Sequence, residues 1–549
     1  MNREWKDNYK SFAEVPHLPL ADALTAGKPA AWNDHLEYME RMYADIHHLY
    51  AQEIRKLDPL AKVGLEGTFG GDNFEQMMDG LDWWGPYSNL VEDEVLRSFY
   101  PNIPRFLWAG YHNERGPGKF PRLTEFLLKG SVNGNGWYST YVHDVHSLIS
   151  SDYSPSFPEP FMADLDRLRF GLAQLLVNNP LKDSGLLVYW SHLSRRASKV
   201  DARCVTPESG MGPLLRFCYK TGMSLEFVSS RKLERLENGK VLLLLGISSL
   251  NQQEAAAILS FVERGGTAIA DINPAVLNQY MNAHQQENPL RELFGNLLLN
   301  ADSPALEIKE LSVTLPNGNV FKADKALQNP ALPCLSSKKY GKGQAILLNF
   351  NFAIAESSAE ASFSIKDFLE NLLAEHGVSS SFKTEQETTL RVRQGHDFDL
   401  IGFRSTDSEI NAGQAIRINL PETRFVYECG QGFLGKQARI EVKQGGKSLY
   451  LFSSFATKQS APKLKLPKKA SRGAIVPLDF GKLPKGRVLC LRITAPDGQD
   501  MPERALVLDT ARKPQAQLQF AWNDQVGKYG LVLEDVTTGL KNSYSVNLE

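Results

Sequence analysis

Carboxylates and aromatic side chains follow several short apolar segments in the first third of the chain. Glu66 ends the segment AKVGLEG, and Glu114 lies in YHNERG, directly after PRFLWAG. The other candidates at the ends of such segments are Asp72, Trp84, Tyr87, Trp108, Tyr111, His112, Asn133, Asn135 and Trp137. A flat aromatic ring can stack on the apolar face of a sugar, and two carboxylates can protonate and attack a glycosidic bond. These residue types therefore suggest chemistry on a glycosidic bond.

Each of these residues also has a purely structural interpretation. The tryptophan rings could fill a protein core, Glu114 could form a surface ion pair with Arg115, and Glu66 could bond to the adjacent Gly-rich segment GTFGGDN. For Trp84 and Trp137, which lie beside Gly-rich strand ends, the sequence does not decide between the two interpretations. The burial of each ring is the observation that separates them.

The elements that must position these residues alternate between strand and helix. Apolar residues at helical spacing predict a long amphipathic helix from Asn33 to about Leu57, with Asn33 or Asp34 as its N-cap. Four strand–helix units follow, and they predict a parallel sheet with helical crossovers. The expected strands are 61–67, 80–85, 104–110 and 131–138, and the expected helices are 90–99, 123–129 and 161–177.

Four units make half of a (β/α)8 barrel, which has eight units in roughly 250 residues and carries its functional groups after the strands. The pattern changes near Pro180. The sequence thus predicts a partial (β/α)8 barrel over residues 1–180. We therefore expect either that the chain is a fragment of a longer protein, or that the other half of the barrel is supplied from elsewhere.

A second α/β region is expected over residues 181–378. Buried strands at 185–190, 224–229, 240–246, 267–271 and 341–350 alternate with helices at 214–220, 251–264 and 364–375. This alternation predicts a flavodoxin-like, doubly wound sheet. Asp271 ends the fourth strand and is a candidate ligand contact, although a helix cap is the preferred interpretation.

After residue 378 helical periodicity disappears, and short alternating segments predict two β-sandwich-like modules. The first is a small β domain at 379–458. The second, at 459–549, combines a linker with an immunoglobulin-like sandwich. Five lysines among prolines predict that Thr457 to Gly473 is a solvated linker.

Composition narrows the classes of partner. The 549 residues include 61 Lys and Arg against 63 Asp and Glu, so a net charge of -2 argues against nucleic acid and membrane surfaces as partners. Five cysteines without CxxC spacing predict neither a zinc site nor a disulfide framework, and no metal or cofactor is expected. The opening MNREWKDNYKSF has no apolar export segment, so the location stays open, with a periplasmic or secreted parent protein as one alternative.

The order of these pieces resembles the family 42 glycoside hydrolases, which are β-galactosidases, over roughly Trp5 to Glu375. The resemblance rests on a Trp-bearing last barrel strand followed by LEFVSS, KVLLLLGISSLNQQEAAAILSFVERGGTAIAD and GKGQAILLNF. It implies retaining hydrolysis of β-linked oligosaccharides or polysaccharides without a cofactor. It also implies that residues 181–378 are a trimerisation domain, similar to class I glutamine amidotransferases, in a homo-oligomer that could be a trimer. The last module resembles β-sandwich appendages of exported bacterial proteins.

The resemblance also assigns roles to residues. The family has an acid Glu after strand four and a nucleophilic Glu after strand seven. Counting back from GSVNGNGWYS as strand eight makes PRFLWAG strand seven and AKVGLEG strand five, so the acid is expected before Met1. Strand seven ends in Trp108-Ala109-Gly110 where the family has its nucleophile, which leaves Glu114 as the nearest carboxylate and Glu66 as the second. The expected substrate-binding residues, chosen from their places at the ends of the predicted strands, are Trp84, Tyr87, Trp108, Tyr111, His112 and Trp137.

Two rival functions follow from the same residues. An amidotransferase would need a cysteine in the turn after KVLLLLG, and that turn reads ISSLN. A protein that kept the fold but lost its carboxylate pair would bind carbohydrate, or serve in assembly, without catalysis. The isolated 549-residue chain is expected to have little or no glycosidase activity of its own.

Overall fold

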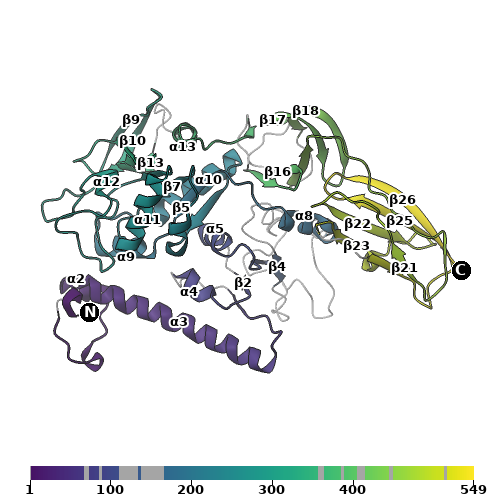
Figure 1. Cartoon of the computed structure of the whole chain (residues 1–549), viewed down its shortest axis with the longest axis horizontal. Coiled ribbons are helices and arrows are strands. Elements are labelled where there is room, and N and C mark those ends of the chain that lie inside the picture. Colours follow the sequence, from purple (N-terminus) through teal and green to yellow (C-terminus); the bar gives the residue numbers. More distant parts are fainter. Residues whose placement is uncertain are drawn as a thin grey trace, which may run out of the picture. The chain divides into compact units, whose positions relative to one another are not determined.

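A computed structural model describes the chain except for residues 1, 6, 67–72, 86–89, 110–133, 138–165, 357–363, 385–388, 405–414, 444–448 and 512–515. The described residues form a mixed α/β structure with many strands, as the sequence predicts, in two compact units (Figure 1). The first unit comprises Met1–Arg105, Asp183–Cys218 and Leu225–Ser379, and the second Phe106–Lys182, Tyr219–Ser224 and Ser380–Glu549. In the described part of the chain, no helix is long and apolar enough to cross a membrane.

The first unit opens with short helices and one long one. They are α1 (Asn2–Trp5), η1 (Phe12–Glu14), α2 (Leu20–Thr25) and α3 (Pro29–Leu57). The expected N-cap at Asn33 or Asp34 is wrong, because α3 begins at Pro29, whose fixed φ suits the first helical turn. Asn33 instead lies inside the helix, where its side chain donates to the carbonyl of Gln279 and accepts from Arg196 at 3.1 Å.

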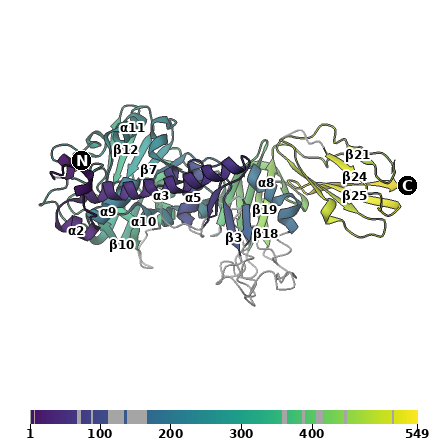
Figure 2. The ribbon, with the colours of Figure 1, turned by 90° about the horizontal axis from the view of Figure 1, so that it is seen from below.

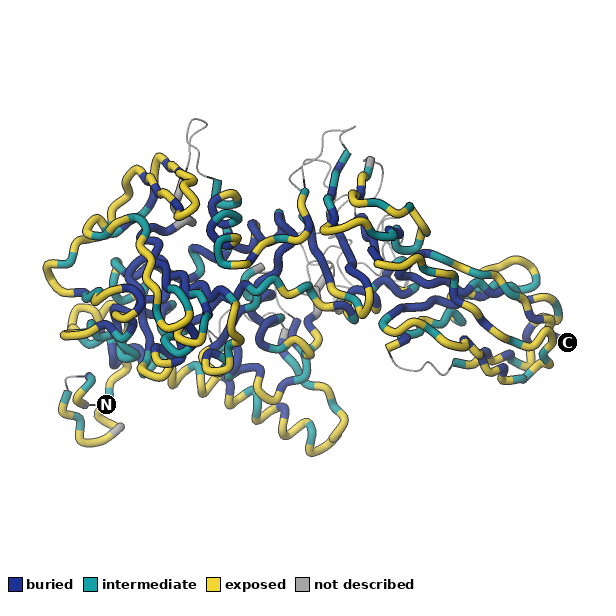
Figure 3. The backbone as a smooth tube through the Cα atoms, turned by 45° about the horizontal axis from the view of Figure 1, so that its top comes forward, coloured by how far each residue is buried: buried dark blue, intermediate teal, exposed yellow. Residues whose placement is uncertain are grey.

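Trp32 near the start of α3 is buried, but from Met39 onward the large apolar side chains of this helix face solvent. They form one stripe at helical spacing, composed of Met39, Met42, Tyr43, Ile46, Leu49, Tyr50, Ile54 and Leu57. The buried positions in the middle of the helix are the alanines Ala44 and Ala51, and Figure 3 shows this long helix as mostly exposed. The helix therefore packs through its small residues.

This arrangement predicts opposite effects from two substitutions on α3. Ile46 is 45% exposed, so Ile46→Lys should change the free energy of unfolding by less than about 0.5 kcal/mol. Ala44 is 1% exposed, so Ala44→Leu should overpack the interface beneath it and cost about 1–3 kcal/mol. Urea unfolding of the two variants tests this, and a larger loss for Ile46→Lys would mean that the stripe is covered in solution.

Two short parallel strands follow α3. β1 (Gly64–Glu66) pairs with β2 (Trp83–Gly85), with α4 (Phe74–Met78) between them and α5 (Leu90–Phe99) after them. Strands and helix were expected at these places, and α5 has the predicted bounds.

The rest of the first unit is built on a six-stranded sheet with the order β11-β12-β8-β7-β5-β6. Its strands are β5 (Leu186–Tyr189), β6 (Leu225–Val228), β7 (Val241–Leu244), β8 (Thr267–Ala270), β11 (Leu335–Tyr340) and β12 (Gly343–Leu348). All neighbours are parallel except β11, which runs antiparallel to β12. The strand VLLL of β7 is buried along its whole length, as expected of a parallel strand covered on both faces.

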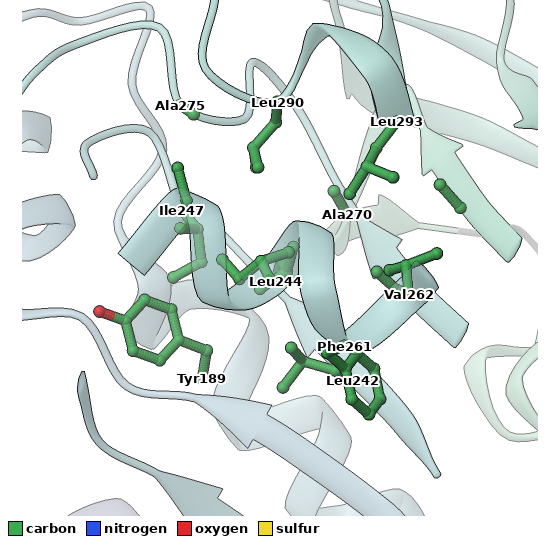
Figure 4. Packing of buried hydrophobic residues seen from close by; sticks show 14 of the residues in the cluster. Tyr189, Leu242, Leu244, Ile247, Phe261, Val262, Ala270, Ala275, Leu290 and Leu293 are labelled. Atoms are coloured by element: carbon green, nitrogen blue, oxygen red, sulfur yellow. The ribbon is translucent and has the colours of Figure 1, made fainter. Parts of the chain in front are cut away.

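Helices and loops cover this sheet. They include α9 (His192–Val200), α10 (Pro207–Thr221), η3 (Ser230–Arg235), α11 (Gln252–Glu263), α12 (Arg291–Phe294) and α13 (Ile365–Ala374). Asn251 caps α11 in a reciprocal capping box with Glu254. Figure 4 shows Phe261 and Val262 of α11 beside Leu242 and Leu244 of β7.

A second sheet in this unit was not predicted. It consists of β9 (Glu307–Thr314), β10 (Val320–Gln328) and β13 (Phe350–Glu356), all antiparallel. Only Leu311 and Val313 of β9 are buried, so the sequence EIKELSVT has too little apolar alternation to reveal a strand.

Among its described residues, the second unit contains a two-stranded parallel sheet, two antiparallel sheets and a five-stranded sheet that is antiparallel except for one parallel pair at its edge. β3 (Phe106–Ala109) pairs with β4 (Gly134–Trp137), and the turn of π-helix η2 (Leu168–Leu172) leads into α8 (Ala173–Asn178). The expected helix 161–177 is interrupted at Gly171, whose φ is +114° and which lies against Val536 and Val488. No larger residue fits there, because a Cβ would come within 2.9 Å of Val536.

The two larger sheets are formed by strands from residues 383–455 and 469–548. One joins β14 (Lys383–Thr384), β15 (Thr389–Gln394), β16 (Phe398–Arg404), β17 (Ala415–Glu428), β18 (Gly432–Lys443) and β19 (Leu449–Phe455). The other joins β20 (Lys469–Ala470), β22 (Val488–Thr494), β23 (Leu506–Asp509), β25 (Gly527–Asp535) and β26 (Leu540–Leu548).

The last module also contains a short strand pair. β21 (Ile475–Leu478) pairs with β24 (Ala516–Gln519), and η4 (Pro502–Arg504) precedes β23. Figure 2 shows β21 and β24 next to β25, and the buried side chains of all three strands belong to one apolar core. The module therefore has two layers of strands around a shared core.

The segment Thr457 to Gly473 is not the free linker that its lysines and prolines suggested. Its lysines are exposed, but Leu464 is buried in the core of the last module and its N–H donates to the hydroxyl of Tyr544. Lys469 and Ala470 form β20, which pairs with the last strand. Alternation of leucine with lysine lets one side of the segment pack while the other stays in water.

Candidate functional site

Glu66 lies at the carboxyl end of a parallel strand, as predicted. In the β1–β2 pair Glu66 is opposite Gly85, and both residues are the last of their strands. Functional groups of parallel α/β sheets collect at this edge. The backbone of Glu66 lies where such a group would be carried.

Close packing between Gly64 and Trp83 holds the two strands together. A Cβ on Gly64 would collide with both the carbonyl oxygen and the Cδ2 of Trp83. The strand that carries Glu66 therefore requires glycine two residues before it.

We expect Gly64→Ala to lower the free energy of unfolding by on the order of 1–3 kcal/mol, because backbone as well as ring must move. Gly212→Ala is a suitable control, since the nearest atom to its new Cβ would be the mobile guanidinium of Arg216 at 3.5 Å. Urea unfolding of both variants checks this, and equal stability of the two would contradict the close approach.

Asp82 fixes the start of β2. Its carboxylate accepts the Val63 N–H at 3.0 Å and a guanidinium N–H of Arg55 at 2.6 Å. The Val63 N–H, with help from Arg55, lowers the pKa of Asp82. The residue therefore stays ionised and serves as a structural clamp between α3, β1 and β2.

Trp84 is part of the core. It is 1% exposed, and its ring lies edge-to-face with Phe74 at a centroid distance of 6.3 Å. Phe74 in turn packs on Trp190, and Trp190 on Phe227. This chain of buried rings favours the structural interpretation of Trp84, because neither face of its indole is open to a sugar in this structure.

The candidates Trp108 and Trp137 lie in the parallel pair β3–β4. Trp108 is opposite Gly136, and Ala109 is opposite Trp137, the last residue of β4. Asn135 lies in the same strand. The backbone thus places Trp137 at a strand's carboxyl end, as predicted. Outside the described residues lie Asp72, Tyr87, Tyr111, His112, Glu114 and Asn133.

Sequence inspection did not single out Arg105, which closes the segment before β3. Its side chain is buried and donates to the carbonyls of Tyr100 and Ile103 at 2.9 and 3.0 Å. Burial lowers the pKa of Arg105 to about 10. The signal for this residue in the sequence was an arginine directly before the apolar segment FLWA. The role of Arg105 is to hold the turn after α5.

The six-stranded sheet has its own carboxyl edge, where ligands of doubly wound proteins bind. The chain turns in opposite directions after β5 and β7, which are neighbours in the sheet. His192 follows β5 with both ring nitrogens buried, and this burial lowers its pKa to about 3. Neither ring nitrogen of His192 has a hydrogen-bond partner among the described residues.

Asp271 lies at the same edge and does not cap a helix, contrary to the preferred interpretation. Its Oδ1 accepts the Gly246 N–H at 2.6 Å, so it stabilises the turn after β7 from a position 25 residues along the chain. Burial raises the pKa of Asp271 to about 7. A residue with this environment is a buried structural acid.

The cysteines of this region are unsuited to nucleophilic catalysis. Cys204 is buried, and this burial raises the pKa of its thiol to about 12. Cys218 is buried in α10. The segment around Val205 and Pro207 lies directly on Gly246, where a Cβ would be 2.8 Å from backbone atoms. Backbone packing thus covers this edge at Gly246. Within the described residues no group of His, Cys, Asp and Glu could hold a metal ion.

No protein-family model matches the sequence, and no curated protein matches it. Solved structures do match, although sequence identity is low. The E323A catalytic variant of Gan42B, a family 42 β-galactosidase from G. stearothermophilus, has a TM-score of 0.59 at 11% identity, over 83% of this chain and 73% of that one. The β-galactosidases of Bacillus circulans sp. alkalophilus and Rahnella sp. R3 both have a TM-score of 0.58 at 12% identity, over 82% of this chain and 74% and 72% of theirs.

The resemblance found in the order of sequence segments is thus matched in three dimensions. Identity of 11–12% is too low for the likeness to extend beyond the fold. Over about four fifths of its length, the chain has the fold of the family 42 glycoside hydrolases.

Proposed function

We propose that this chain is part of a glycoside hydrolase that acts on β-linked sugars of the galactoside class, in an oligosaccharide or a polysaccharide. The observation that carries the proposal is the likeness of fold to the family 42 β-galactosidases. Glu66 at the carboxyl end of β1 supports it, because that is where an enzyme of this fold class carries its functional groups.

In the proposed mechanism Glu114 attacks the anomeric carbon, and a second carboxyl group protonates the leaving oxygen. Glu66 binds a sugar hydroxyl or substitutes as the second carboxylate. Aromatic residues, with Trp137 at the end of β4 as the best placed, stack on the sugar. The mechanism requires no metal or cofactor.

The proposal includes the finer architecture. Residues 1–180 form part of a (β/α)8 barrel, and residues 181–378 a flavodoxin-like trimerisation domain that mediates a homo-oligomer. Residues 379–458 and 459–549 form the two β modules. The buried thiols and the closed carboxyl edge of the six-stranded sheet support a scaffold role for the second domain.

The test is hydrolysis of aryl β-galactosides by the natural polypeptide that contains these 549 residues. Turnover with retention of anomeric configuration supports the proposal. Binding of galactosides without turnover would establish the non-catalytic alternative instead, and absence of both would overturn the proposal.

A further inference from the structure

The last module displays one tryptophan to solvent. Trp522 lies in the loop between β24 and β25 and is 81% exposed. By contrast, every other tryptophan whose side chain is described is buried or half-buried. A solvent-exposed indole offers a large flat apolar face, with a polar N–H at its edge, on which a ligand ring can stack.

The ring of Trp522 has a fixed position. One face lies on Gly473, where a Cβ would come within 2.6 Å of Cε2 and 2.7 Å of Cζ2 of the indole. The φ of Gly473 is +75°, so the turn also requires glycine for its backbone. The indole therefore rests on a glycine surface, with its other face open.

The loop that carries Trp522 is braced by one buried carboxylate. Asp524 accepts the Ala521 N–H at 2.7 Å and two guanidinium N–H groups of Arg504 at 2.5 and 2.6 Å. Arg472, next to Gly473, donates through Nε to the carbonyl of Asp524 at 2.9 Å. Arg504 holds the pKa of Asp524 below its usual range. These hydrogen bonds join the loop that carries Trp522 to the segment beneath its ring, so the open face of the indole is preorganised for a ligand.

We propose that Trp522 is a glycan-binding platform, on which the apolar face of a pyranose ring stacks. Arg472 and Asn523 beside it are exposed and carry hydrogen-bonding groups for sugar hydroxyls. A protein partner fits less well, because a specific protein interface takes about 20–30 residues a side, whereas one ring on a braced loop matches one or two sugar units. The choice of a β-linked galactan as ligand rests on the proposed function.

Binding of the full chain to soluble β-1,4-galactan, measured by affinity electrophoresis and calorimetry, tests this platform. Trp522→Ala should weaken binding about tenfold or more, because it removes the stacking surface, while Trp522→Tyr should retain most of it. Ile475→Ala is the matched control, since Ile475 is an exposed apolar residue of β21 at 56% exposure, and it should bind like the parent chain. The melting temperatures of all three variants should equal that of the parent.

Equal affinity of the parent and Trp522→Ala, or no galactan binding by the parent, would overturn the proposal. So would equal losses from Trp522→Ala and Ile475→Ala. The hydrolase proposal is tested separately, by hydrolysis of small aryl β-galactosides by the natural polypeptide. Failure of one proposal can therefore be distinguished from failure of the other. If Trp522→Ala loses galactan affinity in a polypeptide without turnover, the platform stands and the hydrolase proposal fails; turnover without galactan binding has the opposite meaning.

Discussion

Glu114→Gln in the natural polypeptide should nearly abolish turnover of aryl β-galactosides, with kcat lowered by on the order of 10⁴ or more, because it removes the proposed nucleophile. Glutamine keeps the shape of the side chain but cannot attack the anomeric carbon to form the covalent intermediate of a retaining glycosidase. KM should change much less than kcat, because an amide still accepts hydrogen bonds from the sugar.

Glu66→Gln should have the complementary signature if Glu66 binds a sugar hydroxyl. KM should then rise while kcat stays within a few-fold of the parent value, the pattern of an interaction made equally in the ground state and the transition state. If Glu66 substitutes as the second carboxylate, kcat falls as well. Glu237→Gln, which changes an exposed carboxylate, is the matched control. Unchanged kcat in Glu114→Gln would remove that residue from the mechanism.

The parts of the fold that the sequence predicts best are those whose residues are buried on both faces. β5, β7 and β8 are continuous apolar segments, and the expected helices 251–264 and 364–375 start at Asn251 and Ser364, which are the N-caps of α11 and α13. Local signals suffice there, because burial and capping act within a few residues. The exposed strands β9 and β18 lack such signals, since their pairing depends on partner strands rather than on their own apolar pattern.

In the candidate site, too, the sequence predicts features that depend on neighbouring residues and misses those that depend on distant ones. The position of Glu66 at a strand end follows from the apolar segment before it. The burial of Trp84 does not, because its ring packs on Phe74 of α4, which packs in turn on Trp190, more than a hundred residues from Trp84. Asp271 was misassigned for a related reason: its partner Gly246 lies in another strand's turn. Long-range packing decided these roles, and one sequence carries little information about it.

His192 and Asp271 should give unfolding of the first unit two opposing pH dependences. The pKa of His192 is about 3 in the folded state against 6.5 ordinarily, so the unfolded state binds a proton that the folded state excludes. The stability that neutral His192 provides is complete above pH 6.5 and falls as the pH decreases toward 3, by about 1.4 kcal/mol per pH unit. The pKa of Asp271 is about 7 against 3.8, so the folded state keeps a proton that the unfolded state releases, and stability falls as the pH rises from 3.8 to 7.

Between about pH 4 and 6.5 the two slopes have opposite signs and should nearly cancel in the parent chain. Single variants expose them. In Asp271→Asn, which keeps an oxygen for the Gly246 N–H, stability relative to the parent should rise with pH by about 2 kcal/mol from pH 5 to 6.5. In His192→Phe, which removes two buried nitrogens without partners among the described residues, it should fall by a similar amount. For the double variant, the difference in free energy of unfolding from the parent should not change with pH.

Urea unfolding followed by tryptophan fluorescence from pH 4.5 to 7.5 measures these differences, and comparison of each variant with the parent removes the contributions of all other titrating groups. If the free energy of unfolding of one variant changes with pH in the same way as that of the parent, the substituted group has the same pKa in the folded and unfolded states. Such a result would mean that water reaches the carboxyl edge of the six-stranded sheet. Parallel curves for both variants would reopen this edge as a ligand site. Opposite slopes for the two variants would establish that the carboxyl edge of the six-stranded sheet is closed to water, as the proposed scaffold role of this domain requires. In that proposal the chemistry takes place at the ends of other strands.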